Sequence, residues 1–143
     1  MSGLELVAGI AGILSLTIEV SKITTSYIRG VRDASSGIHS LVRELQALKR
    51  VLIQLDELAS ELDDEYQDGN RQFAMLSVEN SDEYRQTLEE LRRKLEKRMQ
   101  GNSLAVKLKS LKWPFSESST QKTVDLLHRH LEIFKGALSI DTL

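Results

Sequence analysis

The stretch LVAGIAGILSLTI, Leu6–Ile18, runs without a charge between Glu5 and Glu19. A surface helix carries a polar stripe at every third or fourth position, and this stretch has none. The pattern therefore predicts a helix that is buried around its whole circumference. The stretch is roughly 20 Å long at about 1.5 Å per residue, whereas a bilayer core is about 30 Å thick. It is thus shorter than a confident membrane span and more apolar than an ordinary bundle helix.

The residues that follow are typical of an all-helical protein. Pro occurs once, at Pro114, and no long alternation of strand type is present. Ser2 and Glu5 have the spacing of a capping box, so the first helix is expected to begin at Ser2 and to end near Gly30. A turn with N-cap candidates follows over 33–37. Apolar residues then recur at three- and four-residue steps and predict a long second helix: Ile38, Leu41, Val42, Leu45, Leu48, Leu52, Leu55 and Leu62.

Two more helices are expected in the second half of the chain. One begins at Asn80 or Ser81, ends at Gly101 or Asn102, and aligns Tyr84, Leu88, Leu91, Leu95 and Met99 on one face. The last opens with a capping box of Ser118 and Gln121 and aligns Val124, Leu127, Leu131, Phe134 and Leu138. The sequence therefore predicts an all-α fold: a single up-and-down helical bundle of four to five helices over 1–143, with the apolar N-terminal helix packed centrally.

The charges are segregated along the chain, although the net charge is only −2. Residues 56–68 are acidic without a single base, and a basic block interrupted only by Glu96 follows. Each block is typical of a solvated helix face, and the basic block is also a candidate contact for anionic lipid or for an acidic partner. The candidate lipid-contacting residues are Arg92, Arg93, Lys94, Lys97, Arg98, Lys107, Lys109 and Lys112.

No pattern favours catalysis, a metal, a cofactor or nucleic acid. The run from Gly9 to Gly12 lacks the third glycine and the preceding strand of a phosphate cradle. His128 and His130 are two residues apart and point to different sides of a helix, and His39 is distant in sequence, so all three are expected at the surface or its boundary. The basic block lacks the aromatic residues and signatures of nucleic-acid recognition. We expect neither an enzyme nor a cofactor.

Features of a secretory destination are also missing from the sequence. It contains no Cys and no Asn-x-Ser/Thr sequon, and Glu5 rather than Lys or Arg precedes the apolar run. We therefore expect the segment to stay in the mature protein and the chain to be cytoplasmic in its resting state.

Four stretches, in order, resemble the HeLo-like domain found at the N-terminus of fungal STAND-type (NOD-like) receptors and of related cell-death effectors. They are SGLELVAGIAGILSLTIEVSKI, LVRELQALKRVLIQL, LKWPF and TVDLLHRHLEIFKGALSI. The resemblance implies a helical bundle that targets and permeabilises membranes as a cell-death executioner and acts as an oligomer. Its implied partners are other copies of itself, anionic membrane lipids, and an NLR-type receptor or amyloid signalling protein, upstream or fused. The chain is then expected to be an excised domain or a stand-alone effector that moves to the cell membrane on activation.

In that family the N-terminal segment carries the toxicity, which maps here onto Leu4–Val20, with Glu5 and Glu19 as its acidic ends, within an expected membrane-inserting segment over 1–20. Small residues four apart, Ala8 with Gly12 and Ala11 with Ser15, allow close helix contacts in lipid or, equally, inside the soluble bundle. Trp113 suits either a lipid interface or a cap on the bundle core. A homotypic adaptor without membrane activity is the alternative function. The candidate membrane-inserting residues are Leu4, Glu5, Leu6, Val7, Ala8, Gly9, Ile10, Ala11, Gly12, Ile13, Leu14, Leu16, Ile18 and Glu19.

Overall fold

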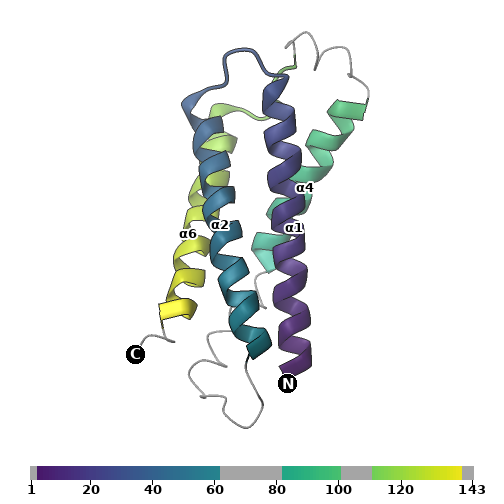
Figure 1. Cartoon of the computed structure of the whole chain (residues 1–143). Coiled ribbons are helices and arrows are strands. Elements are labelled where there is room, and N and C mark those ends of the chain that lie inside the picture. Colours follow the sequence, from purple (N-terminus) through teal and green to yellow (C-terminus); the bar gives the residue numbers. More distant parts are fainter. Residues whose placement is uncertain (1–2, 62–81, 101–110, 140–143) are drawn as a thin grey trace.

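Four long helices make up the described part of the chain (Figure 1). The structure, a computed structural model, describes residues 3–61, 82–100 and 111–139, with side chains from residue 9 onward in the first helix. The helices are α1 (Gly3–Arg29), α2 (Ser36–Glu61), α4 (Asp82–Gln100) and α6 (Glu117–Ser139). These bounds confirm the four expected helices to within a few residues. The capping boxes and caps expected at Ser2, Asn80 and Ser81 lie outside the described residues.

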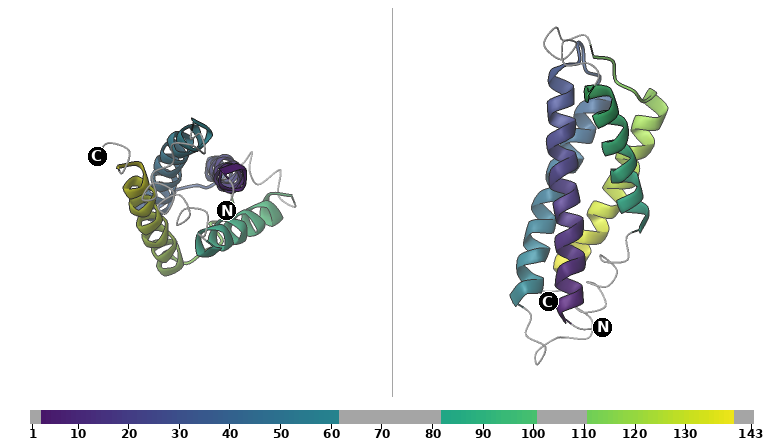
Figure 2. Two further views of the ribbon diagram at one scale, coloured as in Figure 1. Left: turned by 90° about the horizontal axis from the view of Figure 1, so that it is seen from below. Right: turned by 90° about the vertical axis from the view of Figure 1, so that its right-hand side faces the viewer.

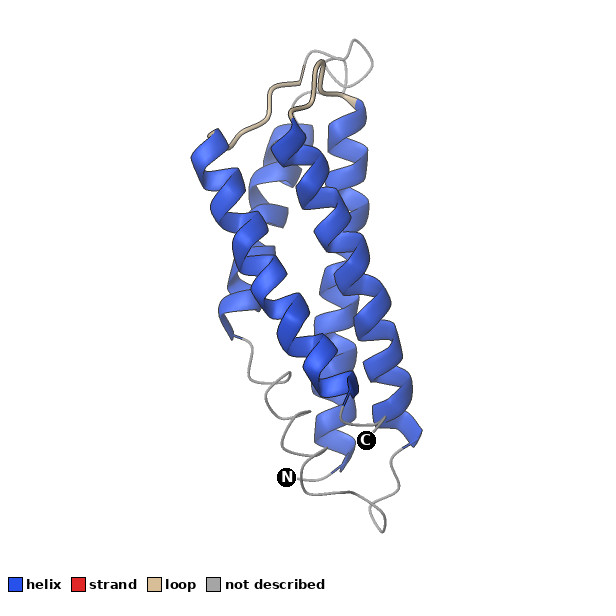
Figure 3. Cartoon of the chain, turned by 90° about the vertical axis from the view of Figure 1, so that its left-hand side faces the viewer, coloured by secondary structure: helices blue, strands red, loops and turns tan. Residues whose placement is uncertain are grey.

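The helices alternate in direction and form the corners of a square in cross-section (Figures 1 and 2). Neighbours around the square are α1 with α2, α2 with α6, α6 with α4, and α4 with α1. Figure 3 shows the described residues as helices joined by loops. Figure 1 shows α4 tilted relative to α1; α4 is the shortest of the four helices, with 19 residues, and its packing on α6 is the sparsest of the four neighbouring contacts. The expected all-α, up-and-down bundle is therefore confirmed.

The core is built mainly from the leucines of α2 and the aligned faces of α4 and α6. Leu45, Leu48 and Leu52 are fully buried, because α2 packs against both α1 and α6. Val42, Met99 and Leu138, expected on the buried faces, are only partly buried, and Leu62 lies outside the described residues. The three- and four-residue spacing thus located the core face of each helix. The expected core residues found buried are Ile38, Leu41, Leu45, Leu48, Leu52, Leu55, Tyr84, Leu88, Leu91, Leu95, Val124, Leu127, Leu131 and Phe134.

α1 occupies one corner of the square and not its centre, which corrects the expectation of a helix enclosed on all sides. Ile10 and Ile13 are buried, whereas Ala11, Gly12 and Ser15 are exposed to solvent. The physical reason is that three partner helices cannot surround a fourth in a ring of four; each helix has two neighbours and one outer face. The small residues of α1 lie on this outer face, where little apolar surface is exposed.

Serine side chains cap the N-termini of α2 and α6. The Ser35 hydroxyl accepts the Ile38 backbone N–H at 3.4 Å and caps α2, within the turn expected there. The cap of α6 is Ser116, whose hydroxyl accepts the Ser119 N–H at 3.0 Å, so the capping box expected from Ser118 is wrong. Ser118 already lies inside the first turn, because the chain enters the helix two residues after Pro114.

The segment over 111–115 closes the end of the bundle at which α1 ends. The Leu111 N–H donates to the Gly30 carbonyl at 2.8 Å, and the Tyr27 hydroxyl donates to the Lys112 carbonyl. Trp113 packs edge-on against Tyr27, with ring centroids 5.9 Å apart, and its Nε1–H donates to the Thr120 hydroxyl at 2.9 Å. Trp113 therefore caps the bundle core, one of its two expected roles.

Candidate functional site

The inward face of α1 carries hydroxyls where the other helices carry leucines. Thr17, Ser21 and Thr24 follow one another at helical spacing, and all three are buried. We call these three residues the hydroxyl seam. Burying a polar group costs free energy unless it finds a partner, so each contact of the seam bears on how firmly α1 is held.

The Thr17 hydroxyl links α1 to α4. Thr17 Oγ1 donates its hydrogen to the Ile13 carbonyl at 2.9 Å and lies 2.6 Å from the Tyr84 hydroxyl oxygen. Because a hydroxyl has one hydrogen, Tyr84 must be the donor to Thr17. Burial raises the pKa of Tyr84 well above its ordinary value, which keeps the phenol protonated and able to donate.

The other two residues of the hydroxyl seam, Ser21 and Thr24, have fewer hydrogen-bond partners than Thr17. Ser21 accepts a hydrogen bond from Gln46 Nε2 of α2 at 3.1 Å, while the Thr24 hydroxyl has no partner among the described residues. At the outer edge, Arg92 of α4 pairs with Glu19 of α1 at 3.0 Å. Both side chains of that pair are partly exposed, so it contributes little. The middle of α1 is therefore attached by the hydrogen bonds of Thr17 and Ser21 to neighbouring helices and by apolar packing of the buried Val20.

The link between Thr17 and Tyr84 yields a double-mutant test. We expect Tyr84→Phe to lower the free energy of unfolding by about 0.5–1.5 kcal/mol, and Thr17→Val to lower it by about 1–3 kcal/mol because the buried phenol loses its acceptor. The double variant should lose less than the sum, since neither polar group then remains. Urea unfolding of the four proteins measures the difference; strictly additive losses would show that the two hydroxyls are not coupled.

The outward face of α1 is made of small residues that pack against nothing in the described bundle. A methyl group added at Gly12 would meet no atom within 4 Å. Ala11, Gly12 and Ser15 are exposed. Among the described residues, these three therefore take no part in close packing inside the bundle; the side chain of Ala8 lies outside the described residues.

The candidate membrane-inserting residues divide between the two faces of α1. Ile10 and Ile13 are buried, Gly9, Leu14, Leu16 and Ile18 are partly buried, and Glu19 is exposed. The side chains of Leu4, Glu5, Leu6 and Val7 lie outside the described residues. In the described part of the chain, no helix combines the length and apolar character that crossing a membrane requires.

Several candidate lipid-contacting residues make contacts within the bundle. Arg92 pairs with Glu19, and Lys94 lies 3.2 Å from Glu90 with its amine 5.2 Å from the centre of the Phe115 ring. Burial raises the pKa of Tyr27, and the charge and hydrogen bond of the nearby Arg98 offset part of that rise. Arg93, Lys97 and Lys112 are exposed, and Lys107 and Lys109 lie outside the described residues.

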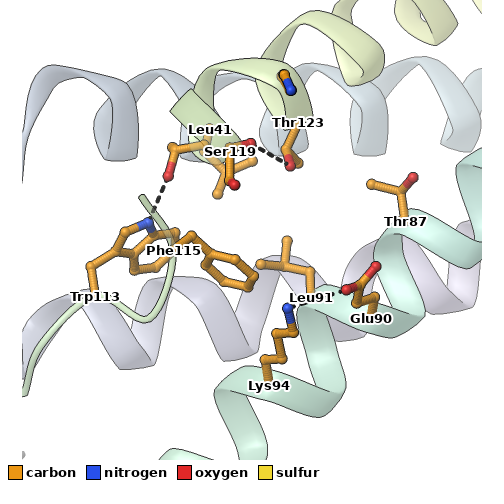
Figure 4. A pocket seen from close by; sticks show the side chains of 11 residues that line it. Leu41, Thr87, Glu90, Leu91, Lys94, Trp113, Phe115, Ser119 and Thr123 are labelled. Carbon is orange, nitrogen blue, oxygen red and sulfur yellow. Dashed lines mark hydrogen bonds and ion pairs between the residues drawn. The ribbon is translucent and has the colours of Figure 1, made fainter. Parts of the chain in front are cut away.

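A cleft of about 250 Å³ opens between α4 and α6, beside the segment that closes the bundle (Figure 4). Leu41, Leu91 and Phe115 give it an apolar lining, as the close view shows, while hydroxyls and charged groups of α4 and α6 surround them. No sequence pattern predicted this cleft, because it depends on how α4 and α6 diverge in the bundle (Figure 1). Its polar lining residues are Thr87, Glu90, Lys94, Ser119, Thr120, Lys122 and Thr123.

His130 is buried, which corrects the expectation that all three histidines lie at the surface. Its exposed fraction is 7%, whereas His39 and His128 are exposed. The signal was in the sequence: His130 is three residues after Leu127 and four before Phe134, so it shares their buried face. Among the described residues, no group of three or more His, Asp and Glu side chains is placed to hold a metal ion.

The chain matches no protein-family model, no curated protein and no solved structure. The hydroxyl seam and the exposed small residues of α1 are the structural features that bear most directly on function.

Proposed function

We propose that this protein is a membrane-targeting, membrane-permeabilising domain of the cell-death type, activated when α1 leaves the bundle and several copies assemble. The observation that carries the proposal is the orientation of α1, which turns hydroxyls inward and small residues outward. The resemblance of four sequence stretches to HeLo-like domains supports the same function.

The hydroxyl seam lowers the cost of releasing α1. When α1 is released, Thr17, Ser21 and Thr24 can form hydrogen bonds with water or with new partners. Their release therefore costs less free energy than the release of leucines at the same positions. Ile10, Ile13, Val20 and Tyr27 are also buried, however, and their apolar surface needs another apolar environment after release. A lipid bilayer supplies such an environment.

The outer face of α1 is suited to contact with another copy of the same helix. Small side chains at Ala11, Gly12 and Ser15 permit close approach of two helix backbones, and they are already exposed in the resting bundle. A single helix cannot enclose a pore, so permeabilisation requires an oligomer. Clustering by an upstream receptor or amyloid partner would supply the local concentration.

The basic residues of α4 contribute the first attraction to the membrane. Arg93 and Lys97 are exposed, and release of α1 would separate Arg92 from Glu19 and add a third cation. Each such residue near an anionic surface contributes about 1 kcal/mol of binding free energy. Resting protein is expected in the cytoplasm and activated protein at the cell membrane.

Cross-linking α1 to α4 tests the release step. The chain has no Cys, so Glu19→Cys with Arg92→Cys gives a unique pair that a short, reducible bis-maleimide can join. The cross-linked protein is clustered through a C-terminal tag on anionic liposomes filled with dye. It should release no more dye than the background, and reduction of the cross-linker should restore dye release. Glu44→Cys with His128→Cys joins α2 to α6 instead and should leave dye release intact.

A second pair of variants tests the assembly step. Gly12→Glu should abolish dye release, because a charge then blocks the small face of α1. Gly136→Glu on α6 is the matched control, since that glycine is also helical and exposed, with no atom within 4 Å of an added methyl group. Full leakage by the cross-linked α1–α4 protein would refute the proposal. No leakage by clustered wild type, with binding to a partner retained, would favour the adaptor function.

A further inference from the structure

His130 is enclosed by aromatic rings between α4 and α6. Its ring centroid lies 5.4 Å from that of Tyr84, at an interplanar angle of 75°, and 6.0 Å from that of Phe134. Neither ring nitrogen has a hydrogen-bond partner among the described residues. A neutral imidazole leaves one donor and one acceptor unsatisfied there, whereas a protonated ring would bury a charge and two unsatisfied donors.

The charged groups that act on His130 come from α4 and α6. Glu83 of α4 favours the protonated ring and Arg129 of α6 disfavours it, and these two residues pair with each other at 2.9 Å. Tyr84 stays neutral. On α2, Glu44 is paired with His128 on another side of α6. Desolvation therefore dominates and lowers the pKa of His130 below its ordinary value.

We propose that His130 is an acid-sensitive lock: protonation drives its ring out of the contact with Tyr84 and Phe134 and separates α4 from α6. Because the Tyr84 ring contacts His130 while its hydroxyl donates to Thr17, loss of the ring contact also removes packing that holds this hydroxyl against α1. The sparse packing of α4 on α6 makes this the side of the bundle that opens with least loss of other contacts. The lock is independent of what α1 does after release, so it stands or falls apart from the membrane proposal.

The sign of the pH effect follows from proton linkage. The unfolded or opened chain binds a proton at His130 near pH 6.5, and the closed bundle binds it only at a lower pH. The contribution of neutral His130 to the stability of the closed bundle is therefore complete above about pH 6.5, and it is lost as the pH falls towards the pKa of His130 in the folded protein. Within that window the folding equilibrium constant should fall by up to about tenfold per pH unit, which corresponds to about 1.4 kcal/mol.

Urea unfolding of the full chain between pH 7.5 and 5.5 tests the lock. Wild type should lose stability below about pH 6.5. His130→Phe, which fills the same aromatic site without titrating, should lose nearly all of that dependence, whereas His128→Gln should retain it. Amide exchange, corrected for the intrinsic effect of pH, should rise first in α4 and α1.

A measurement on wild type keeps the inference testable even if His130→Phe does not fold. The imidazole NMR signals of His130, titrated in the native protein, should show that its pKa lies below the ordinary value of about 6.5. Titration of His130 at or above the ordinary value of about 6.5 would overturn the proposal. An unchanged pH dependence in a folded His130→Phe would overturn it as well.

Discussion

Replacing Ile13 with glutamate is expected to abolish the folded bundle at pH 7, while the same change at its neighbour Gly12 leaves the bundle folded. Ile13 is 1% exposed, so the substitution removes a buried side chain worth about 1.5–3 kcal/mol. It also places a carboxylate where desolvation costs several kcal/mol more. Domains of this size are stable by only about 5–15 kcal/mol, so the sum approaches the whole margin.

Circular dichroism and urea unfolding of the two variants measure this contrast. Gly12→Glu should keep the helical signal and unfold within about 1 kcal/mol of wild type, because glutamate forms helices better than glycine and faces solvent. Equal stability of the two variants would mean that α1 does not pack through Ile13. The contrast also supports the leakage test, since it shows that a charge at Gly12 acts on assembly and not on folding.

Phe134→Ala is expected to cost about 3–5 kcal/mol of unfolding free energy. Phe134 is fully buried, and its ring packs edge-on against Tyr84 with centroids 5.3 Å apart. Truncation leaves a cavity beside two other rings, those of Tyr84 and His130. Because α4 packs sparsely on α6, this cavity also removes part of the packing that positions Tyr84. Of the single truncations considered, this one should produce the largest loss of stability.

Its matched control is the adjacent Ile133→Ala. Ile133 is 42% exposed, so its truncation should change the free energy of unfolding by less than about 0.5 kcal/mol. Urea midpoints with unchanged denaturant slopes in both variants would report stability alone. A loss in Phe134→Ala no larger than that in Ile133→Ala would contradict the packing of α6 on α4.

The helices and their buried faces could be predicted from the sequence, because each depends on residues a few positions apart. The leucines from Leu41 to Leu55 recur at the helical period, and the periodicity placed them in the core. The same rule included His130, which lies on the face of Leu127 and Phe134; residue type rather than position led to the surface assignment. The cap of α6 was misplaced by two residues because several serines follow Pro114 and any of them can cap.

The outward and inward faces of α1 were decided only by the tertiary structure. An apolar run without a polar stripe has no preferred face, so its pattern predicts a helix over Leu6–Ile18 without predicting which side meets water. The orientation of α1 depends on its neighbours α2 and α4. Gln46 of α2 and Tyr84 of α4 form hydrogen bonds with Ser21 and Thr17, and these bonds stabilise the orientation in which the hydroxyls face inward. The cleft likewise arises from the tilt of α4. Short-range periodicity determines where the helices form, whereas contacts between residues distant in the chain determine which face of α1 is buried.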